Sequence, residues 1–340
     1  MPSTIRDVAK KAKVGIATVS RVLNNSPAVS DETRQRVLNA IDELNYKPNL
    51  IARQLSIGKT QTIGVILPYL TLPSYVERLR GIQSVLDESN YDLILFVAEI
   101  PSKRDTFFEK LADKSRADGL IIISLPPTDE QAERFIHENQ PVVLVDAYHS
   151  RLSSIIVNDI QGGRLATKHL IELGHKKIAY ISDYLNTPFY PSMQYRYKGY
   201  RKALEEEKIP YYQKYHLQGD RGRFYAQQMT RQLLNLKDPP TAIFAASDTH
   251  AIGALDVAQE VGIKVPDELS VIGYDGIRDA EYVNLTTIEQ NLFESGVESA
   301  SMLLTMLREK PSDVYKAELS IKLVIRNTTA PPPNPDNHNL

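Results

Sequence analysis

Apolar side chains in the first sixty residues recur every three or four positions, which is the spacing of amphipathic helices. We expect one helix to begin after Thr4, a second near Ile16 and a third after Ser30. The third is expected to end near residue 44. Its apolar face would consist of Val37, Leu38, Ile41 and Leu44. A short fourth helix is expected from Leu50 to about Ile57.

The pattern changes at Thr62, where short continuous apolar runs begin to alternate with longer amphipathic stretches. This alternation indicates buried parallel sheets covered by helices on both faces. About ten strand units are more than one sheet comfortably uses, so we expect two doubly wound lobes joined by chain crossovers. The runs are Thr62–Leu67, Asp92–Val97, Gly119–Ile123, Val142–Val145, Ile155–Val157, Lys177–Ile181, Ala242–Ala245 and Ser270–Gly273. Helices are expected near 75–89, 104–116, 128–138, 161–173, 194–207, 222–236, 249–261 and 293–308.

Charge separates the same two parts. The first sixty residues carry ten Lys or Arg and five Asp or Glu, so their formal charge is +5, whereas the remainder is −7 within a total of −2. A basic head on an acidic remainder suggests a polyanionic partner for the head alone. A basic surface that is merely solvated is the alternative.

Composition excludes several classes of protein. The chain has no cysteine, so disulfides and thiolate metal sites are impossible. Its start lacks the apolar stretch of a secretory signal, and no apolar run approaches the ~18 residues of a membrane span. We therefore expect a cytoplasmic, nucleoid-associated protein. Phosphate-binding loops, zinc-hydrolase pairs and nucleophile elbows are missing and the seven His are scattered, so we expect no enzyme activity, no metal and no cofactor.

Residues 4–24, with Thr18-Val19-Ser20-Arg21-Val22-Leu23-Asn24 at their end, resemble the helix-turn-helix of the lactose/galactose repressor (LacI/GalR) family. Residues 46–55 resemble its hinge, and the likeness continues to residue 331, which is nearly the whole chain. The resemblance implies a homodimeric bacterial regulator with an all-α helix-turn-helix head and an α/β two-lobe core like that of periplasmic binding proteins. It implies DNA contacts by Thr4, Ile16, Ala17, Thr18, Ser20, Arg21, Asn24, Ala52 and Leu55.

The second helix suits the major groove because its first residues are small. Thr18 and Ser20 offer hydroxyls to phosphates, which position the head without reading sequence. Arg21 can bind a guanine bidentately, which is worth about 1–3 kcal/mol against a wrong base. Ile16 and Ala17 can read only shape and thymine methyl groups. A generic three-helix bundle is the alternative interpretation.

The turn departs from the family pattern at two positions. Lys13 stands where the family usually has Gly, so we expect a left-handed backbone there, at about 1 kcal/mol relative to Gly. Gly15 stands where the family usually has a capping Ser, and it can still cap without a side-chain acceptor.

In the hinge, the resemblance assigns Leu55 as a wedge that opens a central base step from the minor groove. The helix that carries it is too short to be stable alone, so we expect it to order only on DNA beside its dimer mate. Movement of the core lobes would then separate the hinges and release the operator. Leu55 as a simple core contact is the alternative.

The core contains three further family segments, residues 158–179, 240–248 and 265–275. Each places polar side chains directly after an apolar run, where open α/β folds bind ligands. Arg196 is the implied donor to a ligand and Asp275 the implied acceptor, although a purely structural salt bridge is the alternative. Ser247 replaces the family's common Asn. The implied effector-binding residues are Ser74, Tyr75, Asp146, Tyr190, Arg196, Ser247, Asp275 and Gln290.

One core segment is rich in aromatic residues, which can stack on sugar rings. We interpret it as a wall for a glycoside or oligosaccharide, with core packing at a helix start as the alternative for part of it. The residues are Tyr184, Phe189, Tyr190, Tyr195, Tyr197 and Tyr200.

The sequence thus predicts a head (1–48), a hinge and linker (49–60), a two-lobed effector-binding and dimerisation core (61–330) and a tail (331–340). The expected function is repression of carbohydrate uptake or catabolism genes, with double-stranded operator DNA and a mono- or oligosaccharide effector as partners. The alternatives are a regulator that needs a corepressor, of the purine type or a phosphoprotein, and a sugar-binding transport receptor. We see no leucine heptads that would predict a tetramer.

Overall fold

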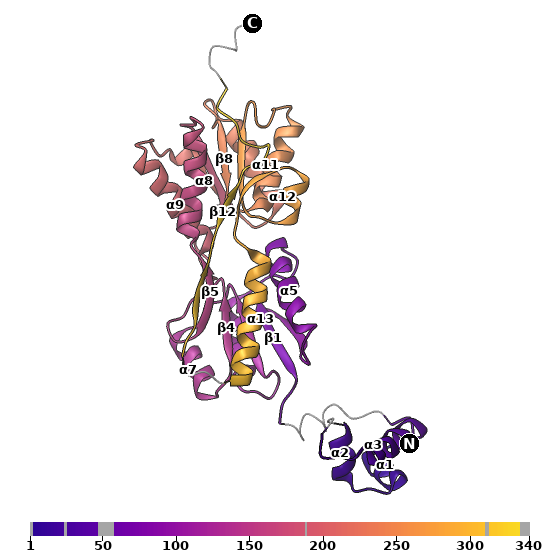
Figure 1. Cartoon of the computed structure of the whole chain (residues 1–340). Coiled ribbons are helices and arrows are strands. Elements are labelled where there is room, and N and C mark those ends of the chain that lie inside the picture. The colour runs from indigo at the N-terminus through magenta and orange to yellow at the C-terminus, as the bar shows by residue number, and fades with distance from the viewer. Residues whose placement is uncertain (1–2, 24–25, 47–57, 188, 310–312, 334–340) are drawn as a thin grey trace. The chain divides into compact units, whose positions relative to one another are not determined.

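The computed structural model describes residues 3–23, 26–46, 58–187, 189–309 and 313–333. The chain divides into two compact units, a head of residues Met1–Thr60 and a core of residues Gln61–Leu340 (Figure 1). Among the described residues, no helix is long and apolar enough to cross a membrane.

The head contains α1 (Ile5–Ala12), α2 (Ile16–Leu23) and α3 (Asp31–Glu43). Thr4 caps α1 in a reciprocal box with Asp7, and Ser30 caps α3 by accepting from the Thr33 amide, so both predicted starts are confirmed. Lys13 has φ 53° and ψ 45°, the left-handed conformation predicted for the turn.

The three helices of the head enclose one small apolar core. Val19 and Val22 of α2 are buried in it together with Val8 of α1. Leu38 departs from the prediction, because 41% of its surface is exposed. The buried face of α3 runs instead through Val37 and Ala40, a spacing of three that leaves Leu38 on the outer side.

Within the described residues of the core, twelve strands form two six-stranded sheets. The pairs are parallel except β10 with β12. The first sheet has the order β11-β5-β4-β3-β1-β2, with β1 Thr62–Leu67, β2 Asp92–Val97, β3 Gly119–Ile123, β4 Val142–Val145, β5 Ser153–Val157 and β11 Lys316–Leu319. The second has the order β12-β10-β9-β8-β6-β7, with β6 Ile178–Asp183, β7 His216–Gly219, β8 Ala242–Ala245, β9 Ser270–Asp275, β10 Thr286–Glu289 and β12 Lys322–Val324.

Every predicted apolar run lies on a strand, but four strands are not among those runs: β7, β10, β11 and β12. Three of them lie at sheet edges, where one or both faces meet solvent and a polar sequence is tolerated. The buried strand β10 has the polar sequence Thr-Thr-Ile-Glu. The buried polar groups of its first residue, Thr286, are satisfied by the C-terminal segment. The Thr286 amide donates to Thr328 Oγ1, and the Thr286 hydroxyl is hydrogen-bonded to Thr329 Oγ1.

Helices cover both faces of each sheet, as the alternation predicts. Residues of α5 (Pro73–Leu86) and α13 (Leu292–Glu309) share one core cluster on the first sheet, and residues of α6 (Pro101–Lys110) and α7 (Asp129–His137) share the opposite one. On the second sheet, α8 (Asp159–Glu172) and α9 (Ser192–Glu206) form one layer. The other layer contains α10 (Arg223–Leu234), α11 (Asp248–Glu260) and α12 (Arg278–Tyr282).

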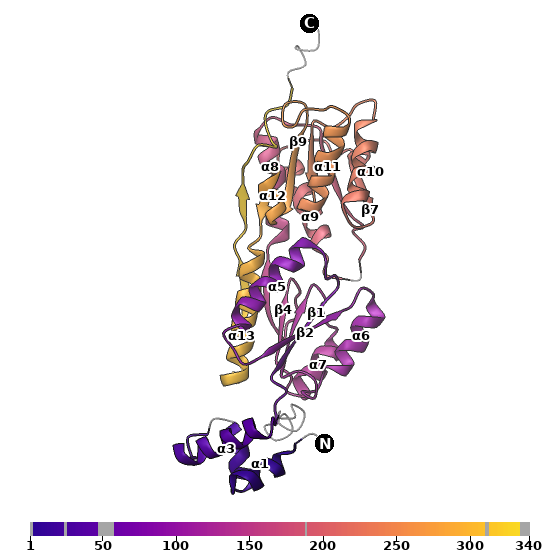
Figure 2. The same cartoon turned by 90° about the vertical axis from the view of Figure 1, so that its right-hand side faces the viewer.

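The chain passes between the two sheets at three places within the described residues: after β5, after β10 and between β11 and β12. Helices α5 and α13 lie side by side in Figure 2. A Cβ on Gly81 would lie 2.0 Å from the Phe293 carbonyl oxygen, and one on Gly296 would lie 2.1 Å from that of Arg78. This close approach places Arg78 of the first lobe beside residues that follow β10 of the second.

Candidate functional site

Helix α2 presents three of its predicted base-reading residues to solvent. Ile16 is 46% exposed, and Ala17 and Arg21 are exposed beside it. Within the described part of the head, no carboxylate lies within ion-pair distance of Arg21. An exposed isoleucine next to an uncommitted arginine suits a surface that contacts apolar and polar edges of bases.

Three hydroxyl-bearing residues of the head are also predicted to contact DNA. Thr18 and Ser20 are half-buried, and Thr4 is exposed with its hydroxyl on Asp7 Oδ2 at 2.7 Å. The salt bridge Lys11–Glu43 (2.7 Å) fastens α1 to α3. Three further predicted DNA contacts, Asn24, Ala52 and Leu55, lie outside the described residues, as does the predicted hinge helix.

A cavity of about 800 Å³, its mouth included, lies in the core where strands of both sheets reach their carboxyl ends. All eight residues that the sequence analysis assigned to the effector line it: Ser74, Tyr75, Asp146, Tyr190, Arg196, Ser247, Asp275 and Gln290. Among the described residues, no three His, Asp or Glu converge to hold a metal ion.

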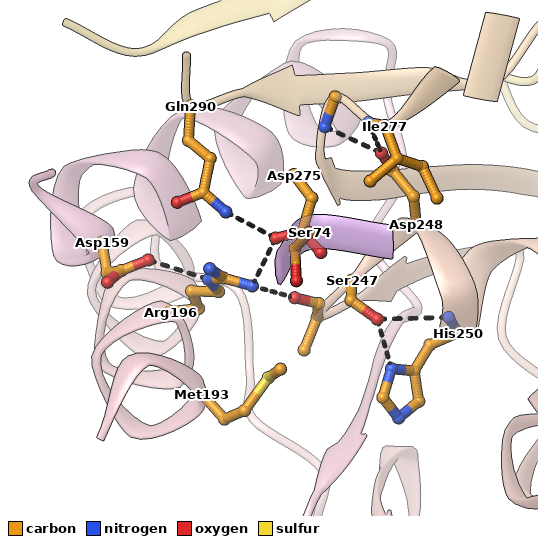
Figure 3. Close-up of polar contacts among 12 residues, drawn as sticks. Ser74, Asp159, Met193, Arg196, Ser247, Asp248, His250, Asp275, Ile277 and Gln290 are labelled. Atoms are coloured by element: carbon orange, nitrogen blue, oxygen red, sulfur yellow. Dashed lines mark hydrogen bonds and ion pairs between the residues drawn. The ribbon is translucent and has the colours of Figure 1, made fainter. Parts of the chain in front are cut away.

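Arg196, on α9, is the most heavily engaged side chain of the cavity (Figure 3). Its Nε donates to Asp159 Oδ1 at 2.8 Å, and its Nη1 donates to Asp275 Oδ1 at 3.1 Å and to the Ala246 carbonyl at 2.7 Å. The guanidinium also stacks 3.8 Å from the ring centre of Tyr274. Burial raises the pKa of Asp159 to about 6 despite Arg196. Arg196 therefore forms structural ion pairs and also lines the cavity.

A second buried arginine, Arg78, extends from the first lobe toward residues that follow β10 of the second. Arg78 of α5 is 4% exposed, with Nη2 3.6 Å from Asp146 Oδ2 and 3.4 Å from Gln290 Oε1. Asp146 Oδ2 also accepts from Ser124 Oγ at 2.9 Å. Asp146 Oδ1, by contrast, is buried without a hydrogen-bond partner among the described residues. The cavity wall therefore contains an acceptor, Asp146 Oδ1, and a donor, Arg78 Nε, that have no hydrogen-bond partner among the described residues.

The backbone is strained around these carboxylates. Asp146 (φ 50°), Ser124 (φ 55°) and Asp275 (φ 119°) all have positive φ without being glycine. Such conformations concentrate at ligand sites, where the surrounding fold holds them. Asp275 Oδ1 accepts from Gln290 Nε2 at 2.6 Å. Burial, opposed by Arg196, raises the pKa of Asp275.

The aromatic segment divides between two roles. Tyr184, Phe189 and Tyr190 line the cavity, and Tyr195 packs edge-on against Tyr190 at 5.7 Å. The prediction of a sugar-facing wall is wrong for Tyr197 and Tyr200. These two rings stack on each other and on Tyr180 inside the second lobe, because they lie on the face of α9 that packs against the sheet.

Sequence reasoning missed several cavity residues, which come from elements it did not connect. Arg221 follows the unpredicted strand β7, and Asp183 ends β6, beyond the apolar run. His250 lies on the first turn of α11, three residues after Ser247. Ser247 is the N-cap of α11 and accepts from the His250 amide, a spacing of three that could have indicated their contact. The lining residues that the sequence did not assign include Tyr69, Arg78, Ser124, Asp183, Arg221 and His250.

Comparison with known proteins agrees with this geometry. Residues 4–49 match the model for bacterial regulatory proteins of the lacI family, and residues 167–329 match a periplasmic binding protein-like domain. The PurR transcriptional repressor of Vibrio parahaemolyticus is 36% identical over 96% of this chain and 98% of its own. The ribose operon repressor of Halalkalibacterium halodurans is 34% identical over 98% and 99%.

Among solved structures, the Lac repressor dimer bound to operator and the anti-inducer ONPF superimposes with a TM-score of 0.84 at 32% identity, over 97% of this chain and 100% of its own. The helix-turn-helix head, the two-lobed core and the identity over almost the full length establish the same assignment. This chain belongs to the LacI family of DNA-binding transcriptional regulators.

Proposed function

We propose that the protein represses genes of carbohydrate uptake or catabolism and leaves its operator when a sugar binds the core cavity. The observation that carries the effector class is Asp146 Oδ1, a buried acceptor in the cavity wall without a hydrogen-bond partner among the described residues. An unsatisfied buried carboxylate oxygen is unfavourable by about 1–3 kcal/mol, so a ligand that brings a donor gains that much. Sugar hydroxyls are such donors.

The charges of the cavity favour a neutral ligand. Three arginines line it, Arg78, Arg196 and Arg221, and each lies within ion-pair distance of a lining carboxylate. The carboxylates are those of Asp146, Asp275 and Asp183. Because the cations are matched, an added anion would not find a compensating charge. Aromatic side chains of the same wall offer faces for the C–H side of a sugar ring.

For the DNA, we propose that Ile16, Ala17 and Arg21 read bases while Thr4, Thr18, Ser20 and Asn24 contact the backbone. Ala52 and Leu55 would enter the minor groove, with Leu55 as the wedge. The exposed apolar side chain of Ile16 supports the reading surface.

The test begins by selecting an operator from random duplexes with the full-length protein. Operator affinity is then measured at one fixed salt concentration with D-ribose, D-glucose, cellobiose, guanine or hypoxanthine. The proposal expects one of the sugars to weaken operator binding at least tenfold and to raise the melting temperature of the core. Sugars without effect on either quantity would refute the sugar assignment.

A purine corepressor is the second candidate, favoured by the 36% identity to PurR. The aromatic rings of the cavity could also stack on a planar base. In that case guanine or hypoxanthine would tighten operator binding in the same assay, which is the opposite sign to the expected sugar effect.

We further propose that the protein acts as a homodimer through an apolar surface on the first lobe. Ile94 and Leu95 of the edge strand β2 are 43% and 36% exposed, and Val76 of α5 is 39% exposed. Apolar residues on an open strand edge are typical of covered surfaces, and the superimposed Lac repressor is a dimer. Ile94→Asp should give monomers in sedimentation equilibrium, whereas Asp92→Asn, on the same strand, should leave the dimer intact.

A further inference from the structure

A chain of buried polar side chains in the cavity wall of the second lobe links Ser247 to three residues that the sequence did not assign: His250, Asp183 and Arg221. Ser247 Oγ lies 2.6 Å from His250 Nδ1 and also accepts from the His250 amide at 3.3 Å (Figure 3). Both side chains are buried, at 7% and 2% exposure, and both line the cavity. The contact is therefore shielded from water and its polarity is fixed by protein neighbours.

The other ring nitrogen of His250 faces a carboxylate. His250 Nε2 lies 3.1 Å from Asp183 Oδ1, which is an ion-pair distance without the angle of a regular hydrogen bond, and neither atom has a hydrogen-bond partner among the described residues. Asp183 Oδ2 accepts from Arg221 Nε at 2.8 Å, and the Arg221 guanidinium stacks 4.0 Å from the ring centre of Tyr69 in the first lobe. Burial raises the pKa of Asp183, but contacts with His250 and Arg221 lower it by a larger amount. The net shift of the pKa is downward, so Asp183 is ionised.

These neighbours discriminate between the two neutral forms of the imidazole. An ionised carboxylate accepts only, so it favours the form with a proton on His250 Nε2. In the neutral ring, Nδ1 is then an acceptor and takes the hydroxyl proton of Ser247. Ser247 retains a lone pair but has no proton left for the cavity.

We propose that His250 fixes the hydrogen-bond polarity of Ser247, so that this part of the cavity accepts from a ligand hydroxyl or N–H and discriminates against a ligand oxygen that can only accept. His250 acts as a positioning residue through Ser247 and does not itself contact the ligand. The ligand part of this inference rests on the proposed function, in which the effector occupies this cavity. An asparagine in place of Ser247, the residue common in the family, would carry both a donor and an acceptor and could not impose this selection.

The first experiment needs no ligand. Long-range ¹H–¹⁵N spectra of the full-length protein with ¹⁵N-labelled histidine are recorded at pH 7.5, and the His250→Leu variant identifies the His250 signals. The inference expects a neutral ring with the proton on Nε2. A proton on Nδ1, with or without one on Nε2, would overturn it.

The second experiment measures discrimination directly. The panel sugar that binds (D-ribose, D-glucose or cellobiose) is compared by calorimetry with its deoxy and deoxyfluoro derivatives at each hydroxyl. At one hydroxyl, both derivatives should bind wild type about tenfold more weakly, because fluorine can accept but not donate. In His250→Leu the deoxyfluoro derivative should regain at least threefold relative to its parent, and in Ser247→Ala the discrimination at that hydroxyl should vanish.

His216→Leu is the matched control, since His216 is buried in the same lobe but does not line the cavity. It should leave the derivative ratios unchanged. Equal ratios in wild type and His250→Leu would overturn the inference. If no panel sugar binds, the sugar assignment fails by itself, and the histidine spectra still decide the polarity of Ser247.

Discussion

Arg21 in the head and Arg196 in the core are both expected to recognise a ligand, but their surroundings are opposite. Arg21 is exposed, and no carboxylate of the described head residues lies within ion-pair distance. Arg196 is 3% exposed and ion-paired to Asp159 and Asp275. The exposed cation of the head can therefore pair with the negative charges of a large polyanion such as DNA. In the core cavity the charges are already paired, which favours the small neutral ligand that we propose.

Substitutions in the two regions should therefore differ in whether they affect ligand binding alone or binding and stability together. A residue without internal partners can be removed from the head surface without leaving anything buried and unpaired. A residue of the cavity is also part of the lobe's buried polar network, so its loss affects stability and ligand response together.

The largest expected effect follows from Arg196→Ala. Removing the guanidinium leaves the carboxyl groups of Asp159 and Asp275 buried without their cation, which destabilises the core by about 3–5 kcal/mol. Denaturant unfolding measures this, and a titration below the melting temperature should show no effector response. Arg201→Ala is the control, because Arg201 lies on the same helix and is exposed. An unchanged effector titration in Arg196→Ala would contradict the assignment of the cavity.

Arg21→Ala should come next and should act on DNA alone. We expect a loss of about 1–3 kcal/mol of discrimination at one operator base pair, with no change in the free energy of unfolding. Affinities for operators that differ at single positions measure it, and Lys10→Ala on α1 is the control. Equal weakening on every sequence would instead make Arg21 a phosphate contact.

Acid should weaken the core more than the head. Burial lowers the pKa of His216 to about 4, with Arg201 contributing, whereas the head contains no histidine. Because the folded core disfavours the charged ring, the stability that it contributes is complete above pH 6.5 and is lost as the pH falls through about 4. Linkage alone gives a loss of about 3 kcal/mol between pH 7 and pH 4, and solvent screening of the partly accessible ring reduces this value.

The pH dependence of core unfolding measures the His216 effect. His216→Phe, which keeps a ring against Tyr197, should reduce the slope in that range. An unchanged slope would assign the acid sensitivity to other groups.

A substitution in the turn of the head should have the smallest effect on stability. Lys13→Gly should stabilise the head by about 1 kcal/mol, because Gly adopts the left-handed conformation of this turn without strain. Lys10→Gly, inside α1, should destabilise the head by about the same amount. Thermal unfolding of the head followed by circular dichroism distinguishes the two. Destabilisation by Lys13→Gly would show that lysine is not strained there.

The sequence by itself determined the helices of the head, their caps, the left-handed turn at Lys13 and the long apolar strands. These features follow from local spacing and from backbone preferences that act within a few residues. The resemblance to a known family supplied the candidate cavity residues, and the carboxyl ends of predicted strands made their convergence reasonable.

Only the tertiary structure decided what surrounds those residues. The edge strands β7, β11 and β12 and the buried strand β10 depend on pairing with distant segments, so their own polar sequences do not reveal them. The contact of Arg78 with Gln290 joins positions 212 residues apart, across the two lobes. The ring of His250 lies between Ser247 and Asp183 because two separate strands end at the same edge of one sheet. Partners that folding brings together determine the hydrogen-bond polarity and ionisation of these side chains. Spacing along the chain determines only which residues share one face of a helix or strand.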